Sequence, residues 1–396
     1  MEAGRADLRR LRKSVVAMAL AVAGGMVGAE ATVVPSGYPG RKLQQACQTI
    51  AANTEQKKLR NPLPKYSDHY YYVQKFNSCL NTLLTPPYIY LYSGSSYNGV
   101  LARDKEGTAV ILAQFPSSGG LGTFGLTPSA IKTIALPNSL ASWPEDALDG
   151  CTALESIFTF GPEVRVPFIT VVRTHFNDCT RLAHVQIPST VEVGDGEFSG
   201  SGSVFPHSLQ SITFPASTRS IGCAAFCYCD QLVSADLSRC ENLTTLVKIR
   251  DNESSKTFAY CYSLSSFNCA GCKSLQSTEW DFLAYCPKLT SIDLSGCTRL
   301  QTLAIATFFT APTGGPRLFF VATLPPSLQA IKHYAFAHSA GTPPGPITLI
   351  WTGRTTRPEV VAEDRPTAGI SYRAFGDSKT LDDLVSAGSV TEIFVP

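Results

Sequence analysis

Cysteines are the side chains of this chain with the most obvious capacity for chemistry, and four of its thirteen lie close together. The stretch "IGCAAFCYCDQLVSADLSRCENL" runs from Ile221 to Leu243 and contains Cys223, Cys227, Cys229 and Cys240. Thiolates bind zinc, form disulfides and act as redox nucleophiles. A buried thiol also packs as a small apolar group. Each of these chemistries requires partner residues at a suitable spacing.

A metal or redox site lacks the expected partners. A zinc site combines two cysteine pairs, or one pair with histidines at suitable spacing. Cys227 and Cys229 form a close pair, but no histidine lies near them in the sequence. Cys269 and Cys272 have C-x-x-C spacing, whereas a thioredoxin-like pair opens a helix after a strand. We therefore expect no metal and no cofactor, and interpret most cysteines as buried structural thiols.

Other catalytic signatures are also missing. The sequence has no G-x-S-x-G, H-E-x-x-H, P-loop or dinucleotide-binding glycine pattern. The histidines share no motif; they are His69, His175, His184, His207, His333 and His338. A net charge of +2 gives no bias toward nucleic acid. We predict that the protein is not an enzyme and binds no nucleic acid, with chemistry housed in residues 32–127 as the remaining enzymatic alternative.

The first residues are typical of an export signal. Arg9, Arg10, Arg12 and Lys13 precede an apolar stretch of small residues from Ser14 to Ala29, and "VGA" or "AEA" offers a cleavage site. We predict a signal peptide over residues 1–29, with an uncleaved anchor as the alternative. The expected location is outside the cytoplasm: periplasmic, on the outer surface or secreted.

An internal repeat organises the second half of the chain. Its fullest copy, "LQSITFPASTRSIGCAAFCYCDQL", starts at Leu209 and reads L-x-x-I-x-F-P followed by I-x-x-x-A-F-x-x-C-x-x-L. The second phrase recurs as "IKHYAFAHS" at Ile331 and "ISYRAFGDSKTL" at Ile370. The L-x-x-I-x-L phrase predicts a short strand with one buried face, which the proline ends. One coil cannot bury these apolar groups alone, so the repeat predicts stacked coils with a continuous parallel sheet.

The repeat resembles the leucine-rich repeat superfamily, and within it the BspA-like or Treponema pallidum-type repeats. Residues 209–232 and 324–339 match that pattern best, and the resemblance covers roughly residues 128–396. It implies an α/β-type repeat solenoid with a parallel β-sheet on the concave face and irregular or short helical return segments. It also implies a scaffold that attaches to host matrix proteins or makes protein–protein contacts at a cell surface.

Most cysteines fall into two repeat columns. Those of the first column end the A-F-x-x-C phrase: Cys151, Cys179, Cys229, Cys261 and Cys286. Those of the second occupy the Asn/Cys position after the strand: Cys240, Cys272 and Cys297. Cys223 and Cys227 remain unassigned, with a disulfide or a metal as open alternatives.

The residues between the buried positions of each strand face outward, and they form the candidate binding face. They are Thr133, Ser156, Phe158, His184, Gln186, Ser211, Thr213, Ser234, Asp236, Thr245, Ser266, Asn268, Ser291, Asp293 and Thr302. Such a polar surface of small side chains suits protein or glycan contact. Any solvated sheet face has a similar composition, so an inert face is the alternative.

Residues 30–127 do not follow the repeat. Leu43, Cys47, Ile50 and Ala51 share one helical face, and Val73, Phe76, Leu80 and Leu83 share another. We predict a helical hairpin followed by short strands, in a mixed α+β cap over the first coil of a solenoid spanning residues 128–396. Cys47 and Cys79 are the best candidates for a disulfide, and a binding role for this region is the alternative.

On these grounds we predict an exported scaffold with a protein ligand. The resemblance favours adhesion to host extracellular matrix or cell-surface proteins. The alternative is a structural or assembly protein of the periplasm or envelope. The sequence gives no oligomeric state.

Overall fold

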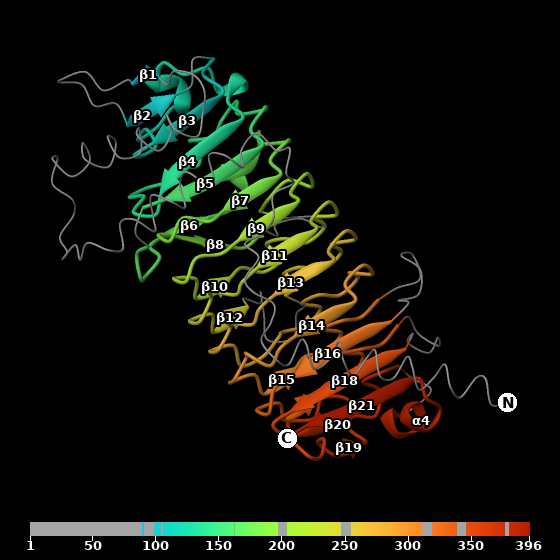
Figure 1. The fold of residues 1–396 in the computed structure, drawn as a ribbon. Coiled ribbons are helices and arrows are strands. Elements are labelled where there is room, and N and C mark those ends of the chain that lie inside the picture. The colour runs from blue at the N-terminus through green and yellow to red at the C-terminus, as the bar shows by residue number, and fades with distance from the viewer. Residues whose placement is uncertain are drawn as a thin grey trace, which may run out of the picture.

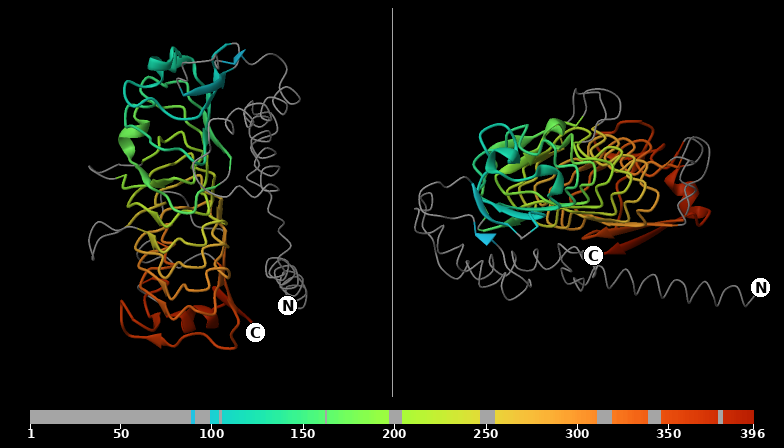
Figure 2. Two further views of the ribbon diagram at one scale, coloured as in Figure 1. Left: turned by 90° about the vertical axis from the view of Figure 1, so that its left-hand side faces the viewer. Right: turned by 90° about the horizontal axis from the view of Figure 1, so that it is seen from above.

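The computed structural model describes residues 89–90, 99–103, 106–161, 163–196, 204–246, 255–310, 319–338, 346–376 and 380–396. Over these residues the chain winds into an elongated solenoid in which each coil stacks on the one before (Figures 1 and 2). The predicted leucine-rich-repeat solenoid is confirmed.

A nine-stranded sheet follows one side of the solenoid. The first two pairs, β1–β2 and β2–β3, are antiparallel, and every pair from β3 onward is parallel. In sheet order its strands are β1 (Ile89–Tyr90), β2 (Val100–Arg103), β3 (Ala109–Leu112), β4 (Thr133–Pro137), β5 (Ser156–Phe160), β7 (His184–Gln186), β9 (Ser211–Thr213), β11 (Ser234–Asp236) and β13 (Ser266–Asn268).

A four-stranded parallel sheet continues along the same side toward the C-terminus (Figure 1). Its strands are β14 (Ser291–Asp293), β16 (Phe320–Leu324), β18 (Ile347–Thr352) and β21 (Val390–Val395). We call these two sheets together the main sheet.

Each coil also contributes short strands to a second side. One parallel sheet contains β12 (Thr245–Leu246), β10 (Ser220–Ile221), β8 (Val191–Val193) and β6 (Ile169–Val171). The other contains β15 (Thr302–Leu303), β17 (Ala330–Ile331), β20 (Gly369–Ser371) and β19 (Val360–Val361). The described helices are short: η1 (Leu121–Phe124), η2 (Pro128–Ala130), η3 (Arg173–Phe176) and α4 (Leu381–Ser386). None of the described helices has the length and apolarity needed to cross a bilayer.

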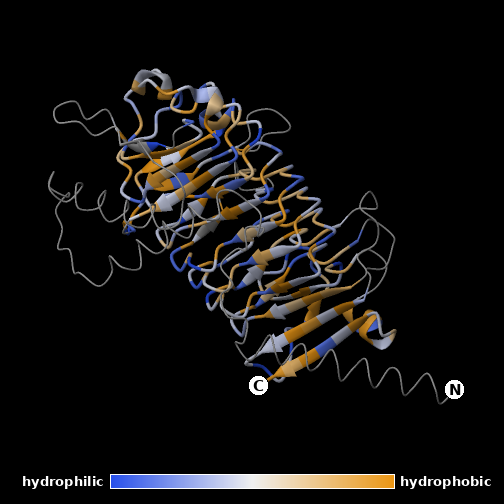
Figure 3. Ribbon diagram, turned by 45° about the horizontal axis from the view of Figure 1, so that its top comes forward, coloured by the Kyte–Doolittle hydropathy of each residue, from blue (hydrophilic) through white to orange (hydrophobic). Residues whose placement is uncertain are grey.

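The period-two alternation of each strand builds the core. In β9, β11 and β13 the central residue points inward and is buried, and the two flanking residues point outward. The parallel register places these central residues, Ile212, Ala235 and Phe267, beside one another. Hydrophobic and hydrophilic segments accordingly alternate along the coils in Figure 3.

Stacked phenylalanines fill the interior behind the sheet. The ring centroids of Phe205 and Phe226 are 5.3 Å apart, and those of Phe226 and Phe258 are 4.7 Å apart, with nearly parallel planes in both pairs. These are offset-stacking distances, which add to the free energy of burial. The phenylalanine of the A-F-x-x-C phrase therefore joins each coil to the next.

The expected export signal, the helical hairpin and the Cys47–Cys79 pair lie outside the described residues. The described part of the region before residue 128 contains β1, β2 and β3. β3 pairs in parallel with β4, so the first parallel strand of the solenoid precedes residue 128.

Candidate binding face

The outward residues of the main sheet form two columns on what we call the outer face. The first column contains Thr133, Ser156, His184, Ser211, Ser234, Ser266 and Ser291. The second contains Phe158, Gln186, Thr213, Asp236, Asn268 and Asp293. Strict register aligns them: Ser234 pairs with Ser211 and Ser266, and Asp236 pairs with Thr213 and Asn268.

Exposure changes along these columns. Ser266, Asn268 and Ser291 are exposed, and the outward residues of β9 and β11 are partly exposed. Toward the N-terminus, Ser156 is fully buried and Phe158 is 1% exposed. The expectation of one open face was therefore wrong for β5, because sequence alternation reports which way a side chain points and not what lies over it.

His184 joins the two parts of the first column. Its Nδ1 lies 2.8 Å from the Ser211 hydroxyl, so a hydrogen bond links β7 to β9. Burial lowers the pKa of His184 below its ordinary value, against the opposing effect of Glu155. The imidazole is therefore neutral at pH 7, and we interpret the contact as a cross-strand bond that fixes both side chains.

The second column is held rigid at the strand ends. Asp236 Oδ1 accepts a hydrogen bond of 2.9 Å from the backbone N–H of Ser238, and Asp293 Oδ1 accepts one of 2.9 Å from Ser295. Asn268 Oδ1 accepts an equivalent bond of 3.2 Å from Ala270. One oxygen of each side chain is used in the turn, which fixes the orientation of the rest. A partner that binds these groups would pay little ordering entropy.

Two predicted members lie elsewhere. Thr245 belongs to β12 and Thr302 to β15, on the second side of the coils. Both follow the Asn/Cys position, where the chain has already turned away from the main sheet. Their leucine spacing resembles that of the first strand, which is why the sequence placed them on the same face.

The cysteines within the described residues are all buried free thiols. In the first column, Cys261 and Cys286 donate to the Phe226 and Phe258 carbonyls of the preceding coil, both at 3.3 Å. Burial raises the pKa of Cys151 to about 12. Thiolate chemistry is therefore suppressed at neutral pH.

The second cysteine column makes the same kind of contact. Cys240 and Cys272 each donate to a carbonyl at 3.6 Å, those of Pro215 and Leu237. Cys297 of the second column is also fully buried, as is Cys179 of the first column. The Cys269–Cys272 pair is thus part of the packing; Cys269 donates to the Asp293 carbonyl at 3.6 Å. No group of His, Cys, Asp or Glu in the described chain is arranged to hold a metal ion.

Cys223 and Cys227, which the repeat left unassigned, lie in a small separate cluster with Ala224, Ala259 and Ala284. Cys223 donates to the Ser255 carbonyl at 3.2 Å. The stretch from Ile221 to Leu243 therefore contains two kinds of cysteine. Cys229 and Cys240 occupy repeat positions in the main core, whereas Cys223 and Cys227 belong to the separate cluster.

That surface carries an aromatic row which the sequence analysis missed. Tyr228, Tyr260 and Tyr285 stack with centroids 4.4 and 4.3 Å apart, and Phe309 meets Tyr285 edge to face at 5.3 Å. Each tyrosine has a positive φ of about 60° and precedes a first-column cysteine. The repeated Tyr-Cys dipeptide was the available signal.

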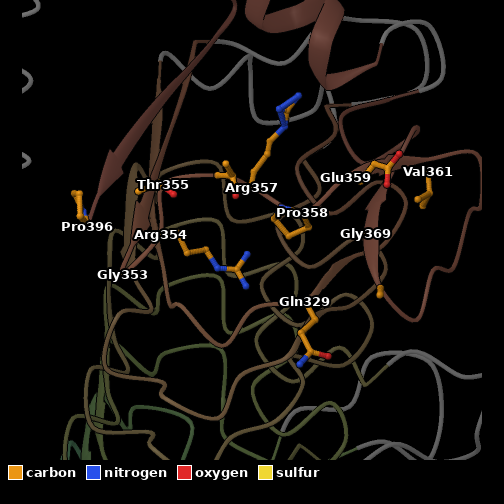
Figure 4. A pocket seen from close by; sticks show the side chains of 12 residues that line it. Gln329, Gly353, Arg354, Thr355, Arg357, Pro358, Glu359, Val361, Gly369 and Pro396 are labelled. Atoms are coloured by element: carbon orange, nitrogen blue, oxygen red, sulfur yellow. The ribbon is translucent and has the colours of Figure 1, made fainter.

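A hollow of about 740 Å³ lies near the C-terminal end of the solenoid (Figure 4). Arg354 and Arg357 line it. Arg357 pairs with Asp382 and Glu392, and Arg354 Nε donates to the Pro326 carbonyl at 3.1 Å. These arginines are engaged within the protein, so the hollow is not an evident anion site.

Comparison with known proteins identifies the repeats. The BspA-type leucine-rich repeat region family matches in six copies over residues 120–204 and 170–310. A search of curated proteins finds no match.

Several solved structures are similar. A Treponema pallidum leucine-rich repeat protein is 20% identical, with 46% of this chain and 91% of that chain covered and a TM-score of 0.29. One from Bacteroides ovatus is 14% identical, with 79% and 76% covered and a TM-score of 0.32. A leucine-rich cell surface protein from Faecalibacterium prausnitzii is 13% identical, with 67% and 89% covered and a TM-score of 0.27.

Leucine-rich repeats are scaffolds that generally mediate protein–protein interaction. Six matched copies and the stacked parallel coils show that residues 120–310 form a BspA-type leucine-rich repeat region.

Proposed function

We propose that this protein is an exported, non-enzymatic scaffold whose outer face from β9 to β14 binds a protein partner. The observation that carries the proposal is the run of exposed or partly exposed polar side chains on that stretch, which the parallel pairing holds in register from β9 to β13. Ser, Asn and Asp side chains there offer many hydrogen-bonding groups on a rigid support. Little conformational entropy is lost when such a surface is covered.

The chemistry of the face selects the kind of partner. Asp236 and Asp293 add negative charge among hydroxyl and amide groups. A complementary surface would present Lys or Arg side chains and hydrogen-bond donors. Extracellular matrix or cell-surface proteins of a host are the partners we propose, and a nucleic acid is disfavoured by the same negative charge.

Export and domain organisation complete the proposal. The basic and apolar sequence of residues 1–29 supports a signal peptide. Residues 30–127 would form the N-terminal cap and residues 128–396 the body of the repeat solenoid. The antiparallel β2–β3 pair at the start of the main sheet supports this, because it separates the first parallel strand from the open sheet edge.

Binding by the full chain to immobilised fibronectin, laminin and collagen tests the proposal. The decisive variant combines Ser266→Arg, Asn268→Arg and Ser291→Arg, which place bulky cations on exposed outer-face positions. We expect at least a tenfold loss of affinity for the matrix protein that binds.

A matched control combines Thr180→Arg, Gln231→Arg and Thr298→Arg, at exposed positions outside the strands. It carries the same added charge and should retain wild-type affinity. Equal affinity of the two triple variants, or no binding to any matrix protein, would contradict the proposed role.

A further inference from the structure

The hollow near the C-terminal end of the solenoid is formed by segments that connect its sheets. Its volume of about 740 Å³ lies within the range of about 300–1,000 Å³ that is typical of small-molecule sites. The connection from β18 to β19 contributes residues 353–359, while Gln329 precedes β17 and Gly369 begins β20. None of these residues belongs to the two columns of the outer face, so the hollow is a separate site.

Arg354 is the cationic group that faces this hollow. Its Nε donates to the Pro326 carbonyl at 3.1 Å, which anchors the side chain to the preceding coil. Its two Nη atoms have no partner in the described part of the chain. Figure 4 shows the side chain extending toward Gln329. The guanidinium therefore offers a fork of N–H donors, which matches the two oxygens of a carboxylate.

Arg357, the other arginine of the hollow, has a different role. Its Nη1 donates to Glu392 of β21 and its Nη2 donates to Asp382 of α4. Two carboxylates thus compensate its charge, and the contacts hold the connection between β18 and β19 against the last coil. In Figure 4 this side chain extends away from Gln329. Arg357 therefore stabilises the wall, and Arg354 supplies the open positive charge.

Glu359 supplies a carboxylate to the same hollow. Its backbone carbonyl accepts a hydrogen bond of 2.7 Å from the N–H of Ile370, which fixes the backbone at this point. The side chain is exposed, and no ion pair or side-chain hydrogen bond within the described residues uses it. Arg354 and Glu359 do not pair with each other. The hollow consequently contains one uncompensated charge of each sign.

Neutral hydrogen-bonding groups lie between these charges. The side chains of Gln329, Thr355 and Thr356 line the hollow and are exposed. No hydrogen bond within the described residues uses the Gln329 amide or the two hydroxyls. An amide offers both a donor and an acceptor, as does a hydroxyl. These groups complement the N–H and C=O groups of a peptide backbone.

We propose that this hollow binds a short peptide with free termini. Arg354 binds the terminal carboxylate, and Glu359 binds the terminal ammonium. The carboxylate of Glu359 disfavours a simple anion, and the guanidinium of Arg354 disfavours a simple cation. A ligand that carries both charges satisfies both groups without leaving a desolvated charge unpaired.

The spacing of the two charged residues fits a peptide of a few residues. Arg354 and Glu359 are five positions apart in the sequence, so their Cα atoms are separated by at most about 18 Å. An extended tripeptide spans about 10 Å, and both side chains reach toward the ligand. The site does not depend on the outer face, so a failed matrix-binding experiment would leave this proposal standing.

Isothermal titration calorimetry of the full chain with a matched set of peptides tests the site. Trialanine carries both charges, N-acetyl-trialanine only the carboxylate, trialanine amide only the ammonium, and N-acetyl-trialanine amide neither. We expect trialanine to bind at least about tenfold more tightly than each of the other three. Equal affinities, tighter binding of a blocked peptide, or no binding of any peptide at about 10 mM would overturn the proposal.

Two variants assign the charged groups. Arg354→Gln should remove the preference for trialanine over trialanine amide and keep the preference over N-acetyl-trialanine. Glu359→Gln should do the reverse. Each variant is judged by its preference between two peptides, so a general loss of stability does not imitate the expected result. Folded variants that keep both preferences would overturn the assignment of the termini to these residues.

Matched controls remove charges of the same kind elsewhere. Arg299→Gln and Glu363→Gln change exposed residues that do not line the hollow. Both variants should bind the peptides as the wild type does. A loss of the same preferences in these controls would show that net charge selects the peptide, and would overturn the proposed site.

Discussion

The two ends of the nine-stranded sheet share one inner face and differ on the outer one. From β3 to β5 and from β9 to β13, the inward residues are apolar and buried in the same register. The outer residues change from the buried Ile111, Ala135 and Phe158 to the partly or fully exposed Thr213, Asp236 and Asn268. The inward residues therefore specify the solenoid, whereas the outward residues are free to differ between its two ends.

The inner face should be the most sensitive to change. Phe258→Ala removes a fully buried ring from the phenylalanine stack. We expect a loss of about 3–5 kcal/mol in the free energy of unfolding, measured by urea denaturation. Phe168, which is 62% exposed, provides the matched control, and Phe168→Ala should change stability by less than about 0.5 kcal/mol. Similar losses in both variants would refute the assigned core.

The buried part of the outer face should show a smaller loss of stability. Phe158→Ala removes a ring that is 1% exposed but lies outside the main core cluster. We expect the free energy of unfolding to fall by about 2 kcal/mol, which is the cost of the lost apolar burial alone. The corresponding exposed position gives the contrast, and Asn268→Ala should be nearly neutral. If Phe158→Ala left the free energy of unfolding unchanged, the two parts of the outer face would not differ in burial as described.

The cysteine columns contribute to both regions through the core. Cys261→Ala deletes a buried thiol and its hydrogen bond to the Phe226 carbonyl. We expect about 1 kcal/mol of destabilisation in the same urea assay. Cys261→Ser keeps a donor for that carbonyl, so part of the loss should be recovered. A serine variant less stable than the alanine variant would argue against the hydrogen bond as the reason for cysteine there.

His184, at the boundary between the regions, should give the smallest effect. Burial depresses its pKa in the folded state, so the unfolded chain binds the proton more readily. The contribution to stability is present above the ordinary pKa of 6.5 and is lost as the pH falls below it. Denaturation midpoints at pH 7.5 and 5.5 should differ less in His184→Gln than in wild type. An identical pH dependence would show that another group dominates.

The repeat phrases predicted the solenoid because inward positions recur in every coil. The L-x-x-I-x-L and A-F-x-x-C phrases put Ile212 and Phe226 in the core. The outward residues were harder to assign. Alternation placed Ser156 and Phe158 on the outer face, but burial there depends on residues distant in sequence. Thr245 and Thr302 were misplaced since the second strand of a coil has similar leucine spacing.

The tyrosine row illustrates another limit. Tyr228, Tyr260 and Tyr285 stack, and the backbone adopts a positive φ at each of them. Residues other than glycine rarely adopt this backbone conformation, and the residue pattern does not predict it. The sequence showed the Tyr-Cys dipeptides but not the geometry that brings them together.

The most direct test of the divided outer face places one substitution at two positions of the same column. Ser156 is fully buried and Ser266 is exposed, although both are serines at the first position of a strand in the same sheet. Urea denaturation of Ser156→Arg and Ser266→Arg compares the two sites. We predict that Ser156→Arg costs more than about 2 kcal/mol because it places a charge at a buried position, whereas Ser266→Arg stays within about 0.5 kcal/mol of wild type. Equal stability of the two variants would contradict the division of this face into a buried and an exposed part.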